Sequence, residues 1–388
     1  VARVRVTDEG KMLRRLSGEL DRQHRLVRAQ SIQRIDGQLL SSYQFRHIVF
    51  QRYLYGSLDE VERVHLHEQV GTALEGLHGT HKQLASVADS TEVLDVAVQL
   101  ARHFQEARIA GKAIHYLHQA GRRALQLSAY DEAVAHLSQG LALLESLPEA
   151  GDVDRSLERA RQEFALQLAL GTALVGPKGF AAPETKRAYS RARELCLQVG
   201  NTSQLCRVVG MLAIHHYVRA EHRRAHELGE EALSLAQQAA DPLLVALGHW
   251  YLGFLSFALG EYIPARAHLQ QMIAFYNPEE HHHSLVSLHG SDAGLSALAY
   301  MGCCLWCLGY PAQALTLSEE VLDLARELGH PFTLADVLCY AGCMLSELRR
   351  DAGALGDYAE AAIGLAETKV KGWLPQATCF RGEALVMQ

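Results

Sequence analysis

The sequence is poor in proline and in aromatic residues. Nine prolines occur among 388 residues and aromatic side chains make up 7%, whereas Ala, Leu, Glu, Arg and Gln are frequent. The frequent types lose little side-chain freedom when they enter a helix. This composition predicts a mainly helical protein, and a charged content of 21% is typical of a folded chain rather than a disordered one.

An excess of basic residues is also missing. The formal net charge is −7, and basic and acidic side chains are interleaved along the chain. Domains that bind nucleic acid usually carry a basic face, so the composition argues against nucleic acid as the partner. The eight cysteines lie at irregular positions and do not form the framework of a small disulfide-rich secreted domain. This cysteine usage predicts a cytoplasmic protein.

Motifs for catalysis and targeting are absent from the sequence. It contains no GxxxxGK[ST] phosphate loop, nucleophile elbow, HExxH motif or dinucleotide fingerprint. We therefore expect no enzyme activity and no cofactor in this chain. It begins at Val1 with neither Met nor an apolar leader, and we expect it to be a piece of a longer protein.

The sequence does contain an internal repeat. In five of six pairs, a small residue in one helix is followed 12 positions later by an alanine in the next helix, and the second pair carries a five-residue insertion around GPKGFAAP. Small residues let two antiparallel helices pack closely, and stacked hairpins bury the apolar face that one hairpin leaves open. The small residues are Gly121, Gly171, Ala213, Gly253, Gly302, Gly342 and Gly382, and the alanines are Ala133, Ala188, Ala225, Ala265, Ala314 and Ala354.

This spacing predicts six helical hairpins from about residue 98, followed by the first helix of a seventh. The pattern resembles the tetratricopeptide repeat, which has a small residue in helix A, an aromatic near the turn and an Ala in helix B; Gly253, Tyr262 and Ala265 match it. The resemblance implies an all-α fold, a right-handed α-solenoid over residues 98–388, with units longer than the plain repeat.

The N-terminal part departs from the repeat. A helical stretch, KMLRRLSGELDRQHRLV, precedes two strand-like runs separated by Asp36-Gly37, a pair that suits a two-residue type I′ turn, and a helical pattern resumes at IVFQRYLYGSL. Helix, hairpin and helix in this order resemble the wing half of a winged-helix module. We predict a winged-helix-like α+β segment at 1–60 and linking helices at 61–97.

A second resemblance extends over nearly the whole chain. QFRHIVFQRYLYGSL, VERVHLHEQVGTALE and GFAAPETKRAYSRARELCLQVGN resemble the region after the ATPase core in large bacterial STAND or AAA-type signalling ATPases. In that group a nucleotide-cyclase, kinase or DNA-binding effector domain often lies further upstream. The resemblance implies that ATPase chemistry lies upstream of Val1, and it gives His47 a possible nucleotide-sensing role; the alternative is a histidine that closes the hairpin.

The concave groove of the array is the predicted binding surface. In tetratricopeptide arrays the helix-A positions one, four and five after the small residue, and three before it, face this groove. Aromatic side chains there would anchor a partner; alternatively they pack between successive helices. The groove residues carried over in this way are Ile214, Tyr217, Trp250, Phe254, Phe257, Cys303, Trp306 and Cys343.

Four other features have simpler explanations. Cys303 and Cys307 are four residues apart on one helix, and Cys339 and Cys343 are four apart on the next equivalent helix. Neighbouring helices lie about 8–10 Å apart, which is too far for the four thiols to bind one zinc, so we expect no metal site. The histidines at 281–283, with His289, are expected in a polar loop. An acidic partner could bind the arginines Arg219, Arg223 and Arg224, but a solvent-exposed helix face would also account for these charges. The uncharged run at 293–318 is interrupted by Pro311 and is too short to cross a membrane.

The sequence thus predicts a protein–protein interaction scaffold or sensor region of a multidomain bacterial signal-transduction ATPase, one that regulates upstream catalytic or effector domains. Its partner would be another protein or those upstream domains. Two alternatives remain open at this point: a fragment of a DNA-binding transcriptional regulator that uses the winged helix, and a motif-poor enzyme on an α-solenoid.

Overall fold

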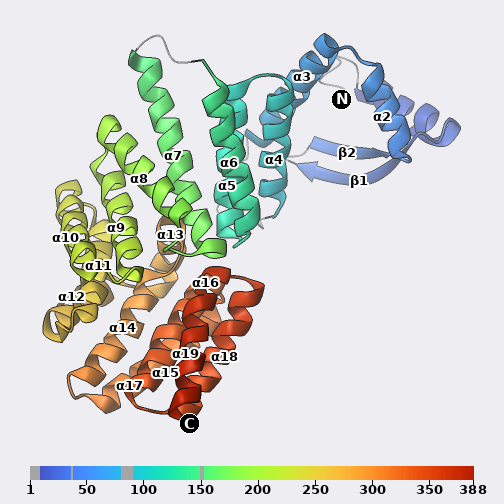
Figure 1. Cartoon of the computed structure of the whole chain (residues 1–388). Coiled ribbons are helices and arrows are strands. Elements are labelled where there is room, and N and C mark those ends of the chain that lie inside the picture. The colour runs from blue at the N-terminus through green and yellow to red at the C-terminus, as the bar shows by residue number, and fades with distance from the viewer. Residues whose placement is uncertain (1–8, 36–37, 80–90, 149–152) are drawn as a thin grey trace. The chain divides into compact units, whose positions relative to one another are not determined.

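The computed structural model describes residues 9–35, 38–79, 91–148 and 153–388 (Figure 1). The chain divides into two compact units, Val1–Leu117 and His118–Gln388. In the parts of the chain described, no helix is both long enough and apolar enough to cross a membrane.

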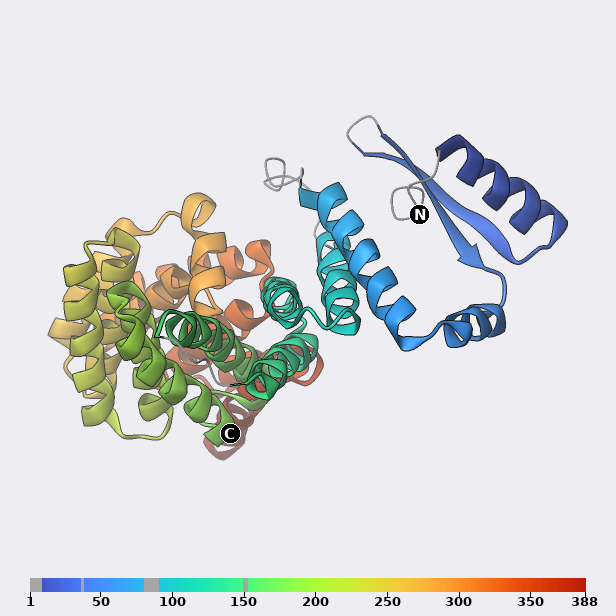
Figure 2. The same ribbon diagram turned by 90° about the horizontal axis from the view of Figure 1, so that it is seen from above.

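The first unit opens with a helix and a β-hairpin. Helix α1 (Glu9–Arg14) continues into the π-helix η1 (Arg15–Gln23), which packs against strand β1 (Val27–Ile35), and β1 pairs antiparallel with β2 (Gln38–Phe45) (Figure 2). Helices α2 (Ile48–Ser57), α3 (Glu60–Gly79) and α4 (Thr91–Glu106) follow. The predicted order of helix, hairpin and helix is confirmed, and its Asp36-Gly37 turn lies outside the described residues. The winged-helix assignment stays a prediction.

Residues 110–388, which include the whole second unit, form an α-solenoid of helical hairpins, as predicted. Each first helix is followed by an antiparallel second helix, and a single first helix, α19 (Leu374–Met387), comes last after the short 3₁₀-helix η4 (Lys371–Trp373). The six hairpins are α5 (Ala110–Gln126) with α6 (Tyr130–Ser146), α7 (Val153–Lys178) with α8 (Pro183–Val199), α9 (Thr202–Val218) with α10 (His222–Ala239), α11 (Pro242–Ala258) with α12 (Tyr262–Phe275), α14 (Ala293–Cys307) with α15 (Pro311–Leu328), and α16 (Pro331–Val337), η3 (Leu338–Met344) and α17 (Leu345–Leu348) with α18 (Ala352–Thr368).

Helix crossings explain most of the small repeat residues. A Cβ added at Gly171 would lie 2.6 Å from the Tyr189 ring, and one added at Gly253 would lie 2.6 Å from the Leu269 side chain. Both partners are fully buried, so a larger residue at either glycine has no room. Gly302 differs, because an added Cβ would meet only the Ala314 carbonyl at 3.5 Å. The repeat positions are therefore equivalent in sequence but unequal in packing.

The insertion between the fourth and fifth hairpins is a helix, so the expected polar loop at the histidine triplet is wrong. Helix α13 (Pro278–His289) begins after Asn277, whose side chain accepts a hydrogen bond from the Glu279 backbone N–H, and ends at Gly290. Its inner face buries His282, Leu285 and His289 at helical spacing. Burial of this face stabilises the helix, and the three histidines at 281–283 give no sign of that burial in the sequence.

The array also makes a contact between segments that are far apart in the sequence. The end of α7 and the loop after it meet η4, where a Cβ added at Gly372 would lie 2.3 Å from the Val175 carbonyl oxygen. In the same region, the Phe180 ring packs edge-on against Phe332 of α16 with centroids 6.1 Å apart. We call this contact the α7–η4 seam. It joins the second hairpin to the last helices of the chain.

Candidate functional site

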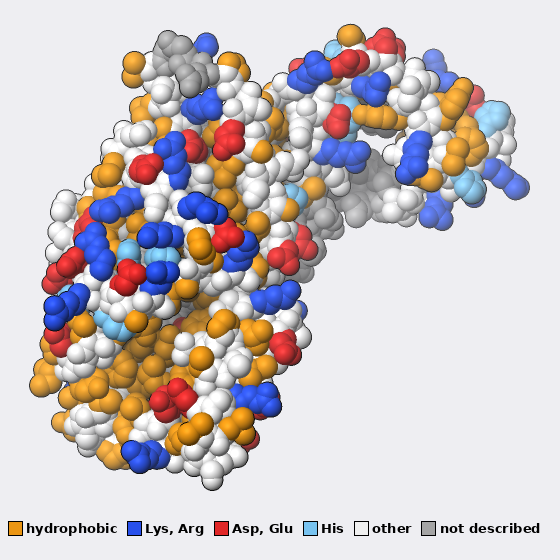
Figure 3. Space-filling view, viewed as in Figure 1, with side chains coloured by type: hydrophobic (Ala, Val, Ile, Leu, Met, Phe, Trp, Pro, Cys, Tyr) orange, Lys and Arg blue, Asp and Glu red, His pale blue; other side chains and the backbone are white. Residues whose placement is uncertain are grey.

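A cavity of about 240 Å³ opens in the second unit. Its lining comes from α7, α9, α11, α13, α14, α16, η3, η4 and α19, and from the loops after α7 and α13. Figure 3 shows hydrophobic side chains gathered in a hollow of this unit. The α7–η4 seam supplies one side of the cavity, because Val175 and Gly372 both line it.

One wall of the cavity is an aromatic cluster on α9 and α11. The Trp250 and Phe254 rings lie 5.0 Å apart, and Tyr217 meets Phe254 edge-on at 5.0 Å. Trp250 and Phe254 are buried, whereas Tyr217 is half-buried. Ring pairs at such separations are favourable beyond their area alone, so this wall is a preformed apolar surface.

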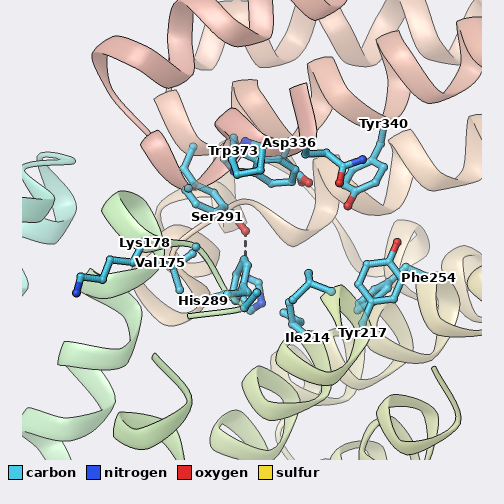
Figure 4. Close-up of a pocket in the computed structure, with 18 of the residues that line it drawn as sticks. Val175, Lys178, Ile214, Tyr217, Phe254, His289, Ser291, Asp336, Tyr340 and Trp373 are labelled. Carbon is cyan, nitrogen blue, oxygen red and sulfur yellow. Dashed lines mark hydrogen bonds between the residues drawn. The ribbon is translucent and has the colours of Figure 1, made fainter. Parts of the chain in front are cut away.

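The facing wall comes from the C-terminal helices. Asp336, Tyr340 and Trp373 lie across the cavity from Tyr217 and Phe254 (Figure 4). A hydrogen bond of 3.1 Å joins the hydroxyls of Tyr217 and Tyr300, and the Tyr300 and Tyr340 rings pack at a tilt of 32° with centroids 4.4 Å apart. These tyrosines link the two walls through side chains from three hairpins.

Asp336 is the acidic group in this wall. It is buried and accepts a hydrogen bond from the Ser296 hydroxyl. Burial raises the pKa of Asp336 to about 7, and the hydrogen bond from Ser296 only partly opposes that rise. Near neutral pH the group is therefore divided between a carboxylic acid, which donates a hydrogen bond, and a carboxylate, which accepts one.

Three buried nitrogen atoms at the cavity have no hydrogen-bond partner among the described residues. They are Nε1 of Trp250, Nε1 of Trp373 and Nε2 of His289. The other ring nitrogen of His289 is 3.0 Å from the Ser291 hydroxyl (Figure 4), and burial lowers the pKa of His289 to about 3, so the ring is neutral. Buried polar atoms are rarely left unpaired. The two indole N–H groups are donors without an acceptor among the described residues.

The loop after α7 forms the mouth of the cavity. Gly179, Phe180 and Ala181 line it, and Ala181 is exposed. Lys178 also lies here, with its Nζ atom 2.6 Å from a Glu184 carboxylate oxygen. Because this lysine is already paired, the mouth presents apolar and backbone groups rather than a free cation.

The structure brings together half of the groove residues expected from the repeat pattern. Ile214, Tyr217, Trp250 and Phe254 line the cavity. Phe257 and Trp306 are half-buried and pack against the hydrophobic core. Their predicted role in partner binding stays a prediction.

Cys303 and Cys343 do not line the cavity, so their placement in the groove needs correction. Both are fully buried in the core, and the Cys303 thiol donates to the Tyr340 carbonyl 3.3 Å away. Tyr300 and Tyr340, two positions before Gly302 and Gly342, occupy the cavity wall instead. The expectation assumed that every first helix presents the same face, whereas the α13 insertion and the π-helical turns of η3 interrupt that register.

Several wall residues escaped the repeat-based reasoning. Tyr300, Phe332, Asp336, Tyr340 and Trp373 belong to the cavity although none was expected there. Two signals were present in the sequence: the GPKGFAAP insertion, which contributes the mouth, and the equivalent positions of two tyrosines before successive small residues. Trp373 had no such signal, because only the seam brings it to the cavity.

The remaining candidate residues lie elsewhere. His47 is exposed at the start of α2, with its ring 6.3 Å from that of Phe50. Arg219 and Arg224 are exposed and pair with Glu221 and Glu227, and Arg223 is exposed beside them. No group of three or more His, Cys, Asp or Glu that could hold a metal ion occurs among residues whose placement is described.

Comparison with known proteins gives one curated relative and several similar folds. No protein-family model matches the sequence. An uncharacterised protein of Rhizobium meliloti (strain 1021) is 24% identical over 301 residues, which cover 77% of this chain; the match spans only 27% of that protein's length.

Solved structures of tetratricopeptide-like repeat proteins resemble the chain in fold. The Rap conjugation gene regulator of the plasmid pLS20, solved in complex with the Phr* peptide, is 13% identical with a TM-score of 0.50 and covers 83% of this chain and 94% of its own. A STAND protein with a tetratricopeptide repeat sensor from Pyrococcus horikoshii is 11% identical with a TM-score of 0.40, covering 87% of this chain and 48% of its own. At these identities the likeness concerns the fold alone.

Proposed function

We propose that this chain is a recognition region whose cavity receives an extended peptide segment, either from a protein partner or from another part of the same protein. The observation that carries the proposal is the preformed aromatic cavity with two buried indole N–H donors that lack acceptors. A peptide backbone offers one carbonyl acceptor per residue, so it could satisfy both donors while an apolar side chain fills the space between the walls.

The size of the cavity favours an anchoring side chain over a whole small molecule. Pockets that enclose a drug-sized ligand have volumes of roughly 300–1,000 Å³, whereas this cavity measures about 240 Å³. An aromatic or aliphatic anchor with its flanking backbone matches that volume. The peptide-bound Rap regulator has a similar fold, which makes such an occupant reasonable for this architecture.

The test is to block the mouth of the cavity. Ala181 is exposed and lines the cavity, so Ala181→Trp should occupy the mouth at little cost to stability. Peptides selected from a displayed random heptapeptide library on the immobilised chain serve as probes. Their affinity, measured by titration calorimetry, should fall at least tenfold in Ala181→Trp.

A matched control is Ala312→Trp, because Ala312 is also exposed but lies at the start of α15 and lines none of the cavities described here. Selected peptides should bind this variant as they bind the unmodified chain. A selection that yields no binder, or peptides that bind Ala181→Trp unchanged, would overturn the proposal. Thermal melting of both variants checks that the fold is retained.

We further propose that the chain is the cytoplasmic sensor part of a larger bacterial signal-transduction ATPase of the STAND type, with the winged-helix-like segment joining it to upstream domains. The resemblance of the sequence to that group supports this context, as does a curated relative that is much longer than the match. A GxxxxGK[ST] motif in the residues encoded before Val1 is the expected result. An upstream region without any nucleotide-binding motif would refute the ATPase context but would leave the peptide-binding proposal standing.

A further inference from the structure

A second cavity of about 560 Å³ lies in the same unit, on the other side of α13. Its walls come from the C-terminal half of α5, the start of α6, and α7, α9, α11 and α13. The two cavities divide at the end of α13: His289 and Ser291 line the first, whereas Leu288 and Gly290 line the second.

The lining of the second cavity carries basic side chains and no acidic one. Arg122, Arg207, His118 and His283 line it, and neither Asp nor Glu does. The whole chain has 44 acidic and 37 basic residues and a net charge of −7. A cavity wall without a carboxylate is therefore contrary to the overall composition and creates a local positive potential.

Arg207 is the central group of this cavity. Its Nη2 atom donates a hydrogen bond of 2.6 Å to the Leu288 carbonyl, while its Nε atom is buried and has no partner among the described residues. No described carboxylate forms an ion pair with Arg207 or with Arg122. Burial lowers the pKa of Arg207, and the nearby charge of Arg122 acts in the same direction. The Arg207 guanidinium nevertheless stays charged.

The hydrogen bond to Leu288 has a structural role of its own. A cation near the last carbonyls of a helix is favourable, and Leu288 lies in the last turn of α13. That role uses one of the five N–H donors of the guanidinium. It explains neither the unpartnered Nε atom nor the absence of an acidic residue from the wall, since a buried charge is normally paired.

We propose that the second cavity binds an oxyanion, a carboxylate or a phosphate, which Arg207 holds through its free N–H donors and Arg122 holds from the exposed side. The planar guanidinium fork matches either anion with two parallel hydrogen bonds. Gln204 and Ser287 line the same cavity and offer neutral donors to the remaining oxygens. The proposal rests on residues outside the aromatic cavity and does not depend on peptide binding there.

Titration calorimetry on the whole chain at constant ionic strength tests this site with two probes. One is inorganic phosphate, and the other is an acetylated, amidated Gly-Glu-Gly peptide, so the two arms separate a free phosphate from a side-chain carboxylate. We expect saturable binding of at least one probe. Arg207→Gln should weaken it at least tenfold, and Arg207→Lys should weaken it as well, because the lysine keeps the charge but loses the fork.

Arg122→Gln keeps the test decisive if the Arg207 variants unfold, because Arg122 is exposed. This variant should bind the probe about three- to tenfold more weakly while melting as the unmodified chain does. Arg224→Gln is the control, since Arg224 is an exposed arginine outside the cavity that pairs with Glu227. Absence of saturable binding to the unmodified chain, or equal binding by Arg122→Gln and Arg224→Gln, would overturn the proposal.

Discussion

The α7–η4 seam gives the sharpest prediction, because a single methyl group should disturb it. In Gly372→Ala the new Cβ would lie 2.3 Å from the Val175 carbonyl oxygen and 2.9 Å from the Cα and N atoms of Gly179. All three are backbone atoms, so no side-chain rotation relieves the clash. The substitution must therefore move η4 away from the end of α7.

The expected magnitude follows from two opposing effects. Overpacking a close contact costs about 1–3 kcal/mol, and a backbone clash at this distance belongs at the upper end. Replacing Gly by Ala also reduces the freedom of the unfolded chain, which stabilises by about 0.4–1 kcal/mol. We expect Gly372→Ala to lower the free energy of unfolding by about 2 kcal/mol.

Gly382 provides the matched control in the following helix. A Cβ added there would meet nothing within 4 Å, and the residue is exposed in α19. Gly382→Ala should therefore stabilise by about 0.5–1 kcal/mol through helix propensity and the unfolded state.

Urea unfolding followed by far-UV circular dichroism and by tryptophan fluorescence compares the two variants. Trp373 adjoins the altered residue, so its emission should change in Gly372→Ala even before unfolding. Midpoints are the safer measure, because long repeat arrays do not always unfold in one step. If Gly372→Ala shifts its midpoint upward as Gly382→Ala does, the seam is not a close contact and the reasoning fails.

Two further predictions concern buried groups of the same unit. Burial raises the pKa of Asp336 to about 7, from an ordinary value of 3.8 in the unfolded chain. Between about pH 4 and pH 7, only the folded state therefore keeps the carboxyl proton. The free energy of unfolding falls as the pH rises through that window. The loss in the free energy of unfolding is on the order of 4 kcal/mol at most. Asp336→Asn removes the titrating group, so the free energies of unfolding measured in urea at pH 5 and pH 8 should differ less in this variant than in the unmodified chain. An unchanged difference would contradict the raised pKa of Asp336. Gly171→Ala forces a Cβ against the buried Tyr189 ring and should lower the free energy of unfolding by about 1–2 kcal/mol. Gly302→Ala meets no such contact and should raise the free energy of unfolding by up to about 1 kcal/mol. Urea midpoints measure both effects, and equal shifts would show that the two helix crossings are packed alike.

Helix α13 shows how far sequence reasoning reached and where it stopped. Its signals were all present: Asn277 as cap, Pro278 and two glutamates in the first turn, and Gly290 after the last turn. The three consecutive histidines nevertheless favoured a polar loop, because histidine has a polar side chain. In the structure, His282 is buried and its Nδ1 atom is 2.7 Å from the Asp292 carboxylate, a partner that no local pattern could identify.

The groove residues show a similar limit. The repeat register predicted Tyr217, Trp250 and Phe254 in the binding groove, and these residues line one wall of the cavity, since α9 and α11 present equivalent faces. It failed for Cys303 and Cys343, because the helices that follow α13 turn different residues toward the cavity. A repeat pattern records the spacing of helix contacts, but the face that each helix exposes depends on its neighbours.

The sequence by itself determined the helical hairpins, their number in residues 110–388 and the close crossings at glycines such as Gly253. These features depend on residues less than one repeat apart, so local spacing encodes them. Only the tertiary structure decided that the second hairpin meets η4, that Gly372 lies against Val175, and that Trp373 completes the aromatic cavity. Such contacts join segments almost 200 residues apart, and the small rotations between successive hairpins that bring them together leave no periodic trace in the sequence.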